Sequence, residues 1–269
     1  MTLERLIQAI ELPEVVQIKM LDLHEFNSNQ YHLEIKGLQD FANAASTHER
    51  LITQLNDPTG MMMLYIFLRA IVENKPRYDK LNITEDIYIE TYKALSRFIK
   101  EYYKDTNQYI FERDWWAYRQ VSMQIFRIGT LEYEMTSIDS KPILSIHIPS
   151  DAILSKSNIA SSLKAAKAFF NTRFKTYEDV EMECHTWLLS PALIDLLPPE
   201  SKILNFQSFF KIREVIPTDT SFLHWVFHTK NSDIDQLEEK TSLQIQIKAH
   251  LKAGKIVGAA IGVIDVTKL

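Results

Sequence analysis

The stretch from residue 143 to residue 210 constrains the fold more than any other part of this sequence. It begins with a strand-like segment, ILSIHIPS, and continues through a polar turn into an amphipathic helix over residues 158–174. A second strand-like segment, VEMECHTWLL, and further helical sequence follow. A strand, a helix and a strand in this order predict two parallel strands joined by a right-handed crossover. The sequence from residue 126 onward therefore predicts an α+β domain with a mixed sheet.

Strand patterns on both sides of the crossover extend this sheet. Residues 126–135 alternate apolar and polar side chains with one change of phase, which predicts a strand with a bulge at Gly129. Turn residues at 137–142 then predict an antiparallel hairpin with the first crossover strand. Farther along the chain, the pattern predicts strands over 212–217, 221–229 and 258–266, short helices from Pro191 and over 201–212, and a helix over 242–253 that ends at Gly254.

Residues 1–125 carry helical spacing with few strand signals, which predicts a separate helical domain. Thr2 is the expected N-cap of its first helix. The run MMMLYIFLRAIV at 61–72 is apolar on all sides and predicts a buried helix, which should end at Asn74-Lys75-Pro76. The remaining predicted helices cover residues 38–56, 86–104 and about 112–126.

The composition excludes several classes of protein. The 269 residues suffice for two domains, over 1–125 and 126–269, and a net charge of −5 without a Lys/Arg run argues against nucleic acid. The single cysteine, Cys184, excludes a disulfide within the chain and a CxxC zinc site, and predicts a small buried hydrophobe. The N-terminus is too polar for a signal peptide, and the run at 61–72 is short and contains Arg69. We therefore expect a soluble cytoplasmic protein that does not enter a membrane.

Two histidines and a group of small polar residues are the candidates for chemistry. His147 lies near the end of the first crossover strand and His185 lies on the second, where an imidazole could accept a proton near neutral pH. No third ligand accompanies them in sequence, so no metal site is expected. The following helix start offers free N–H groups to an anion such as a pyrophosphate, and the side chains there are Ser150, Ser155, Ser157 and Asn158. The alternatives are that the histidines are hydrogen-bonded structural residues and that the serines only cap the helix.

Four segments together match a known family: WWAYRQVSMQIFRIGTLEYEM, LSIHIPS, CHTWLLSPALIDLLPPESKILNFQSFF and TSLQIQIKAHLKAGKIVGAAIGVI. They resemble the bacterial acyltransferase-domain family, whose members join a helical N-terminal domain to a GNAT-like C-terminal domain with a mixed sheet and flanking helices. The resemblance covers essentially the whole chain and is densest over 116–269. It implies that acetyl-CoA or another acyl-CoA binds, without a metal, between two splayed parallel strands. The pyrophosphate of the acyl-CoA would lie at the start of helix 158–174.

The resemblance also implies a reaction. An amine of a small molecule or peptide would attack the thioester, whose carbonyl a backbone N–H of the first splayed strand would polarise. His147 or His185 would accept the amine proton, directly or through water. The helical domain would shape the acceptor pocket, to which Trp187 and Glu132 are also assigned.

One segment departs from the family pattern. GNAT enzymes usually cradle the pyrophosphate with a Q/R-x-x-G-x-G/A loop, whereas SDAILSKSN in this chain contains no glycine. Backbone approach to a pyrophosphate is then less free. The alternative function is therefore a non-catalytic ligand-binding or interaction protein on a degenerate GNAT scaffold. The sequence gives no indication of oligomeric state.

Overall fold

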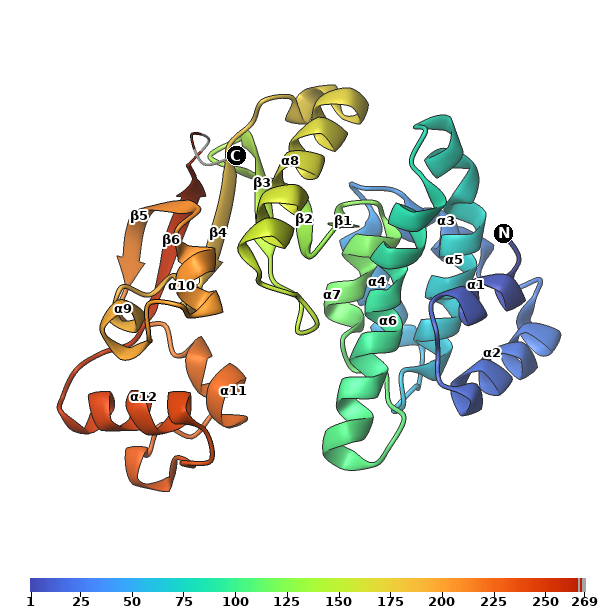
Figure 1. Cartoon of the computed structure of the whole chain (residues 1–269). Coiled ribbons are helices and arrows are strands. Elements are labelled where there is room, and N and C mark those ends of the chain that lie inside the picture. The colour runs from blue at the N-terminus through green and yellow to red at the C-terminus, as the bar shows by residue number, and fades with distance from the viewer. Residues whose placement is uncertain (266, 268–269) are drawn as a thin grey trace. The chain divides into compact units, whose positions relative to one another are not determined.

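The computed structural model describes residues 1–265 and 267. The chain divides into two compact units, Met1–Ile128 and Gly129–Leu269 (Figure 1). The expected last strand over 258–266 and the expected second domain over 126–269 include residues 266, 268 and 269, which lie outside the described residues. Among the helices described, none is both long and apolar enough to cross a membrane.

The first unit is helical, as its spacing predicts. Thr2 caps the first helix by accepting a hydrogen bond from the Arg5 N–H, and Thr84 caps α6 in the same way. The apolar helix α5 is central, because α1, α2, α3 and α7 all pack against it. The elements of this unit are α1 Leu3–Ala9, α2 Glu14–Asn27, α3 His32–Gln39, α4 Ala44–Gln54, α5 Met61–Lys80, α6 Glu85–Thr106, α7 Asp114–Val121 and β1 Ile125–Ile128.

The expected single helix over 38–56 is wrong, because the chain turns between α3 and α4. The carboxylate of Asp40 accepts hydrogen bonds from the backbone N–H groups of Ala42 and Asn43, each at 3.0 Å. This local turn competes with helical bonding and separates the two helices.

Two other expected helix ends are also wrong, and tertiary contacts explain the first. Helix α5 continues through Pro76 to Lys80, since Tyr78 beyond the proline is fully buried and packs edge-on against Tyr88. Helix α7 ends at Val121 rather than near residue 126, and Met123 takes a positive φ of 62° before β1 begins.

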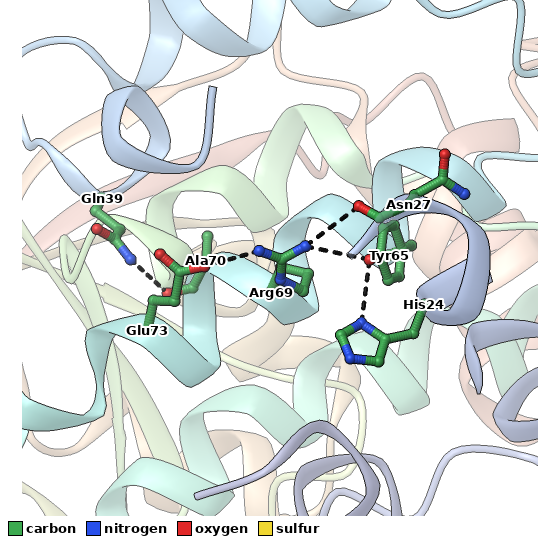
Figure 2. A network of polar contacts seen from close by, with 7 residues as sticks. All are labelled: His24, Asn27, Gln39, Tyr65, Arg69, Ala70 and Glu73. Atoms are coloured by element: carbon green, nitrogen blue, oxygen red, sulfur yellow. Dashed lines mark hydrogen bonds and ion pairs between the residues drawn. The ribbon is translucent and has the colours of Figure 1, made fainter. Parts of the chain in front are cut away.

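A buried guanidinium organises the packing around α5 (Figure 2). Arg69 donates to the Tyr65 hydroxyl at 3.2 Å and to a Glu73 carboxylate oxygen at 3.0 Å. The same hydroxyl lies 3.2 Å from Nδ1 of His24 on α2, and Gln39 of α3 donates to the Ala70 carbonyl. Because a buried charge is costly unless it is paired, this network fixes the position of α2 against α5.

Replacing Tyr65 with phenylalanine removes the hydroxyl that accepts from buried Arg69. We expect Y65F to lower the free energy of unfolding by about 1–3 kcal/mol, the usual cost of leaving a buried donor without its partner. Urea titration followed by far-UV circular dichroism measures this change. Tyr103, which is exposed in the same unit, provides the control Y103F. Equal losses in the two variants would contradict the role given to the network.

The sheet is mixed, with the strand order β1-β2-β3-β4-β6-β5, as the order of elements predicts. Strands β2 and β3 pair antiparallel, β3 and β4 pair parallel, and β6 pairs antiparallel with both β4 and β5. The strands of the second unit are β2 Leu131–Ile138, β3 Lys141–His147, β4 Met182–Thr186, β5 Phe210–Ile216 and β6 Ala259–Ile264. Its helices are α8 Lys156–Arg173, α9 Ala192–Leu196, α10 Lys202–Gln207, α11 Ser221–Phe227 and α12 Ser242–Lys252, with short 3-10 turns at Lys175–Tyr177, Trp187–Leu189 and Ile234–Gln236.

The hairpin of β2 and β3 is confirmed, with a two-residue turn in which Asp139 and Ser140 both have positive φ. The expected bulge at Gly129 is wrong. Gly129 has a φ of +62° and lies in the turn between β1 and β2, which explains the change of phase. A Cβ at Gly129 would lie 3.2 Å from the Ser162 Cβ, so this turn also approaches α8 closely.

The expected strand over 221–229 is wrong, because these residues form α11. Its buried residues Phe222, Leu223, Val226 and Phe227 recur at helical spacing and contribute to an apolar cluster with Ile247 of α12. The aromatic and β-branched composition is typical of a strand, but burial along one helical face prevails. The expected helix over 201–212 is likewise shorter, since α10 ends at Gln207 and β5 begins at Phe210.

Two glycines of one loop provide a matched pair for testing close packing. Gly254 and Gly258 have φ values of +72° and +64°, but a Cβ at Gly254 would meet nothing within 4 Å. A Cβ at Gly258 would lie 2.6 Å from the Ile216 carbonyl oxygen and 2.9 Å from the Pro217 Cα. We expect G258A to lose about 1–3 kcal/mol more unfolding free energy than G254A, because overpacking adds to the same backbone strain. Comparable midpoints in urea for the two variants would disprove this.

Candidate functional site

The pairing of the parallel strands β3 and β4 stops before their C-terminal ends. Their paired residues are Leu144 with Met182 and Ser145 with Glu183, and the register of the described residues continues no farther. Strand β4 meanwhile stays paired with β6 as far as Thr186. We call this unpaired region at the carboxyl ends of the two parallel strands the gap, since ligands of open sheets commonly bind at such ends.

His147 is the last residue of β3, at one side of this gap. Its Nε2 lies 2.8 Å from Oε2 of Glu134 on β2, and its side chain is 26% exposed. In the register of β2 and β3, Glu132 pairs with His147 and Glu134 with Ser145, so these side chains share a face of the sheet. That face is opposite the one covered by α8, because Tyr133 points the other way and bonds Ser162 of α8 at 2.9 Å.

His185 lies on β4, at the other side of the gap. Its Nε2 is 3.2 Å from Oδ2 of Asp219, and its side chain is 49% exposed. The register of β3 and β4 places His185 on the same face as His147. The structure thus brings both predicted histidines to one face, each with its own carboxylate.

Neither carboxylate partner is a predicted site residue. Asp219 stands in the turn between β5 and α11, within Asp219-Thr220-Ser221, and accepts a hydrogen bond from the Ser221 N–H. The N-cap of α11 is Thr220, which makes no side-chain capping bond, so Asp219 carries no capping signal in the sequence. Glu134 alternates with the apolar residues of β2 and resembles an ordinary outward-facing acid.

The environment of these groups changes their proton affinities in different directions. Burial raises the pKa of Asp219, but hydrogen bonds from Ser221 and the proximity of His185 outweigh burial and lower it overall. For Cys184, burial and then the charge of Glu183 raise the pKa well above its usual range. The Cys184 thiol is therefore a small buried hydrophobe, as its sequence context predicts, and is a poor nucleophile at neutral pH.

Ser155 caps α8, as predicted for this group of polar residues. Its hydroxyl accepts from the Asn158 N–H at 3.2 Å and lies 3.2 Å from the Ser157 hydroxyl, whereas Ser150 is exposed in the preceding turn. The loop before α8 is held by Thr130, whose hydroxyl accepts from the Ile153 N–H at 2.7 Å. The cap and this anchor fix the helix start beside the end of β3.

Trp187 and Glu132, the residues assigned to the acceptor pocket, are both buried. The Trp187 ring belongs to the apolar cluster that includes Leu193, Phe222 and Ile247, while Glu132 lies on β2 opposite His147. Among the described residues, no group of three or more His, Cys, Asp or Glu side chains is arranged to hold a metal ion.

The second unit also has an apolar hollow of about 380 Å³. It lies on the other side of the sheet from His185, because Ile212 in its wall pairs with Gly262, which pairs with Cys184. Its polar wall residue Gln207 is already bonded to the carbonyls of Leu188 and Ser190. The hollow is lined by Leu189, Pro191, Ile194, Leu204, Gln207, Ser208, Phe210 and Ile212.

Replacing Asp219 with asparagine should reduce stability in a pH-dependent way. A carboxyl whose pKa is lowered on folding stabilises the protein above its unfolded pKa, and this contribution is lost as the pH falls through the folded pKa. We expect the stability difference between wild type and D219N to be largest at neutral pH and to shrink below about pH 4, near the ordinary aspartate pKa. Urea midpoints measured from pH 7 to pH 3 test this, with D195N, at an exposed aspartate, as control. A difference that grows on acidification would contradict it.

Two family models match the chain. The model of an N-acyltransferase N-terminal domain matches residues 1–123, and that of a GNAT-like C-terminal domain matches residues 125–264. A comparison with curated proteins finds no match.

Several solved structures have a similar fold. One is an acyltransferase in complex with decanoyl-CoA and teicoplanin, with a TM-score of 0.76 and 19% identity. Others are an acyltransferase in complex with decanoyl-CoA, with a TM-score of 0.71 and 22% identity, and a mutant in complex with octanoyl-CoA, with a TM-score of 0.75 and 20% identity. Each alignment covers 97% of this chain and 86% of the other. At these identities the likeness establishes the fold.

Proposed function

The chain belongs to the acyltransferase family that joins an N-acyltransferase N-terminal domain to a GNAT-like C-terminal domain, and on this premise we propose that it is an acyl-CoA-dependent N-acyltransferase. The single observation that carries the proposal is the separation of β3 and β4 beside the capped start of α8. The gap takes the thioester end of the acyl-CoA. The exposed groups Ser150, Ser157 and Asn158, with the α8 N-terminus capped by Ser155, take its pyrophosphate.

Backbone geometry supports a polarising role for the gap. The Leu144 N–H donates to the Glu181 carbonyl at 2.9 Å, so the backbone groups of Glu181 face β3. Since these directions alternate along a strand, the N–H of His185, four residues farther along β4, faces the same side beyond the last residue pair. This puts the proposed donor on the second splayed strand and not on the first, where the resemblance had placed it. A thioester carbonyl in the gap would accept this bond, which strengthens as negative charge develops on the oxygen.

In the proposed reaction, the acceptor nitrogen attacks the thioester carbon. A carbon–nitrogen bond forms, the carbon–sulfur bond breaks, and CoA leaves as the thiolate, which is then protonated. The acceptor's proton passes to His185 or His147, directly or through water. The greater exposure of His185 makes it the better placed of the two bases.

The solved relatives guide the choice of substrates. Because they hold decanoyl- and octanoyl-CoA, we include medium-chain acyl-CoAs with acetyl-CoA as candidate donors. The relative that holds teicoplanin supports a small-molecule acceptor with an amine, beside the peptide amine that the sequence also allows. Residues 1–125 would then form the helical N-terminal domain and residues 126–269 the acyltransferase domain of a cytoplasmic enzyme.

One observation favours a second function, a ligand-binding protein without catalysis. The segment between β3 and α8 contains no glycine, and Thr130 anchors its backbone at Ile153. A stiff, glycine-free loop restricts backbone approach to a pyrophosphate.

Binding of CoA distinguishes the proposed acyl-CoA-dependent function from any function that does not involve CoA. Free CoA or decanoyl-CoA at about 100 times its Kd should stabilise the protein by about 2.7 kcal/mol, because a ligand of the native state shifts the unfolding equilibrium. Thermal unfolding with and without each ligand measures the shift. An unchanged midpoint at millimolar CoA would disprove the acyltransferase proposal.

The histidines then distinguish an enzyme from a binding protein. We expect H185A to lower kcat by about 10²–10⁴, the usual contribution of a general base, while CoA still binds. H147A tests the other candidate in the same assay, with thiol release from decanoyl-CoA and a panel of amines as the readout. Binding of CoA without turnover by the wild type would favour the non-catalytic function.

A further inference from the structure

The carboxylate of Asp219 is held by bonds that leave one oxygen for His185. Oδ1 accepts the Ser221 N–H at 2.7 Å, and Oδ2 lies 3.2 Å from the His185 Nε2. The Asp219 N–H in turn donates to the Ile216 carbonyl at the end of β5. Each oxygen of the carboxylate therefore has a distinct partner.

The turn that carries Asp219 is also held from the other side. Gly258, directly before β6, approaches the Ile216 carbonyl and Pro217 too closely to admit a Cβ. Strand β6 runs between β4 and β5 and pairs with both. The distance between Asp219 and His185 is thus set by the sheet and by this close approach, although the two residues are far apart in sequence.

A carboxylate can only accept from a neutral imidazole, so its contact decides which ring nitrogen carries the proton. We propose that Asp219 is a positioning residue that keeps the proton of neutral His185 on Nε2 and leaves Nδ1 as the basic nitrogen. This inference rests on the proposed function for its catalytic meaning, since Nδ1 would then receive the acceptor's proton. Asp219 would also stabilise the imidazolium that forms.

Two other carboxylates lie on the face of the sheet that carries His185. Glu214 of β5 shares its face across Ile261, and Glu183 lies two residues earlier on β4. The Glu183 carboxylate is bonded to Arg213 at 2.7 Å, which neutralises its charge. Among the ion pairs of the described residues, Asp219 is the partner of His185.

The D219N variant tests this proposal, because the backbone N–H of Ser221 needs an acceptor and so determines where the side-chain oxygen of the asparagine lies. In D219N the side-chain oxygen would still accept the Ser221 N–H, so the NH₂ group would face Nε2. Nε2 must then accept a hydrogen bond, which transfers the ring proton to Nδ1. Nitrogen-15 correlation spectra of histidine-labelled protein, at a pH where the imidazoles are neutral, identify the tautomer, and the H185Q spectrum assigns the His185 signals.

We expect the Nε2–H tautomer in wild type, the Nδ1–H tautomer in D219N, and wild-type signals for His185 in the matched control E134Q, which alters the carboxylate beside His147. An Nδ1–H tautomer in wild type, or an unchanged tautomer in D219N, would overturn the proposal. If D219N fails to fold, the wild-type spectrum still tests the proposal. It must contain a downfield signal from an Nε2 proton that is absent from the H185Q spectrum.

Activity provides the second readout. D219N should lower kcat at least tenfold with an unchanged KM for the acyl-CoA, because the basic nitrogen is lost while the cofactor site is not. A tautomer change with unchanged kcat would overturn the positioning role in catalysis. If wild type shows no turnover but the tautomers behave as expected, the proposed function fails and the assignment of the Asp219 contact stands.

Discussion

The pairing of β3 with β4 is the constraint on which the candidate site depends. These strands are parallel, and the register of the described residues ends after Ser145 and Glu183. Strand β3 is held on its other side by the long antiparallel pairing with β2, and β4 is held by β6. Because each strand has a strong partner away from the gap, the two can diverge without leaving the sheet. The backbone N–H of His185, whose direction follows from the bond between Leu144 and Glu181, then faces the unpaired region.

Hydrogen bonding alone does not distinguish a catalytic histidine from a structural one. His48 in the helical unit is 2.8 Å from Asp114, stacks on Tyr118 and is almost fully buried. His185 also has a carboxylate partner, with 3.2 Å between its Nε2 and Oδ2 of Asp219, but half of its side chain remains exposed beside the gap. Burial closes the first imidazole to a substrate, whereas exposure leaves the second available. The sequence left open whether each histidine has a catalytic or a structural role, and the solvent accessibility of the imidazole best compares these alternatives.

The sequence predictions succeeded where local pattern and tertiary burial agree. The buried face of α8 recurs at the predicted spacing, and Ser155, within the predicted group of caps, caps it. The predictions failed where local pattern and tertiary burial conflict. Residues 221–227 look like a strand by composition but bury one helical face, and Pro76 does not end α5 because Tyr78 beyond it packs in the core. Asp219 was missed as well, because it lies in the short turn between β5 and α11 and no local pattern marks it.

The sequence by itself determined the order of strand and helix around the crossover, the helical first half, and the two histidines at strand positions. These follow from side-chain periodicity and local capping, which depend on near neighbours in the chain. Only the tertiary structure decided where β3 and β4 stop pairing and which carboxylates reach the histidines. His185 on β4 and Asp219 after β5 are brought together by β6, a strand from later in the chain that pairs between them, and no local pattern encodes such a contact.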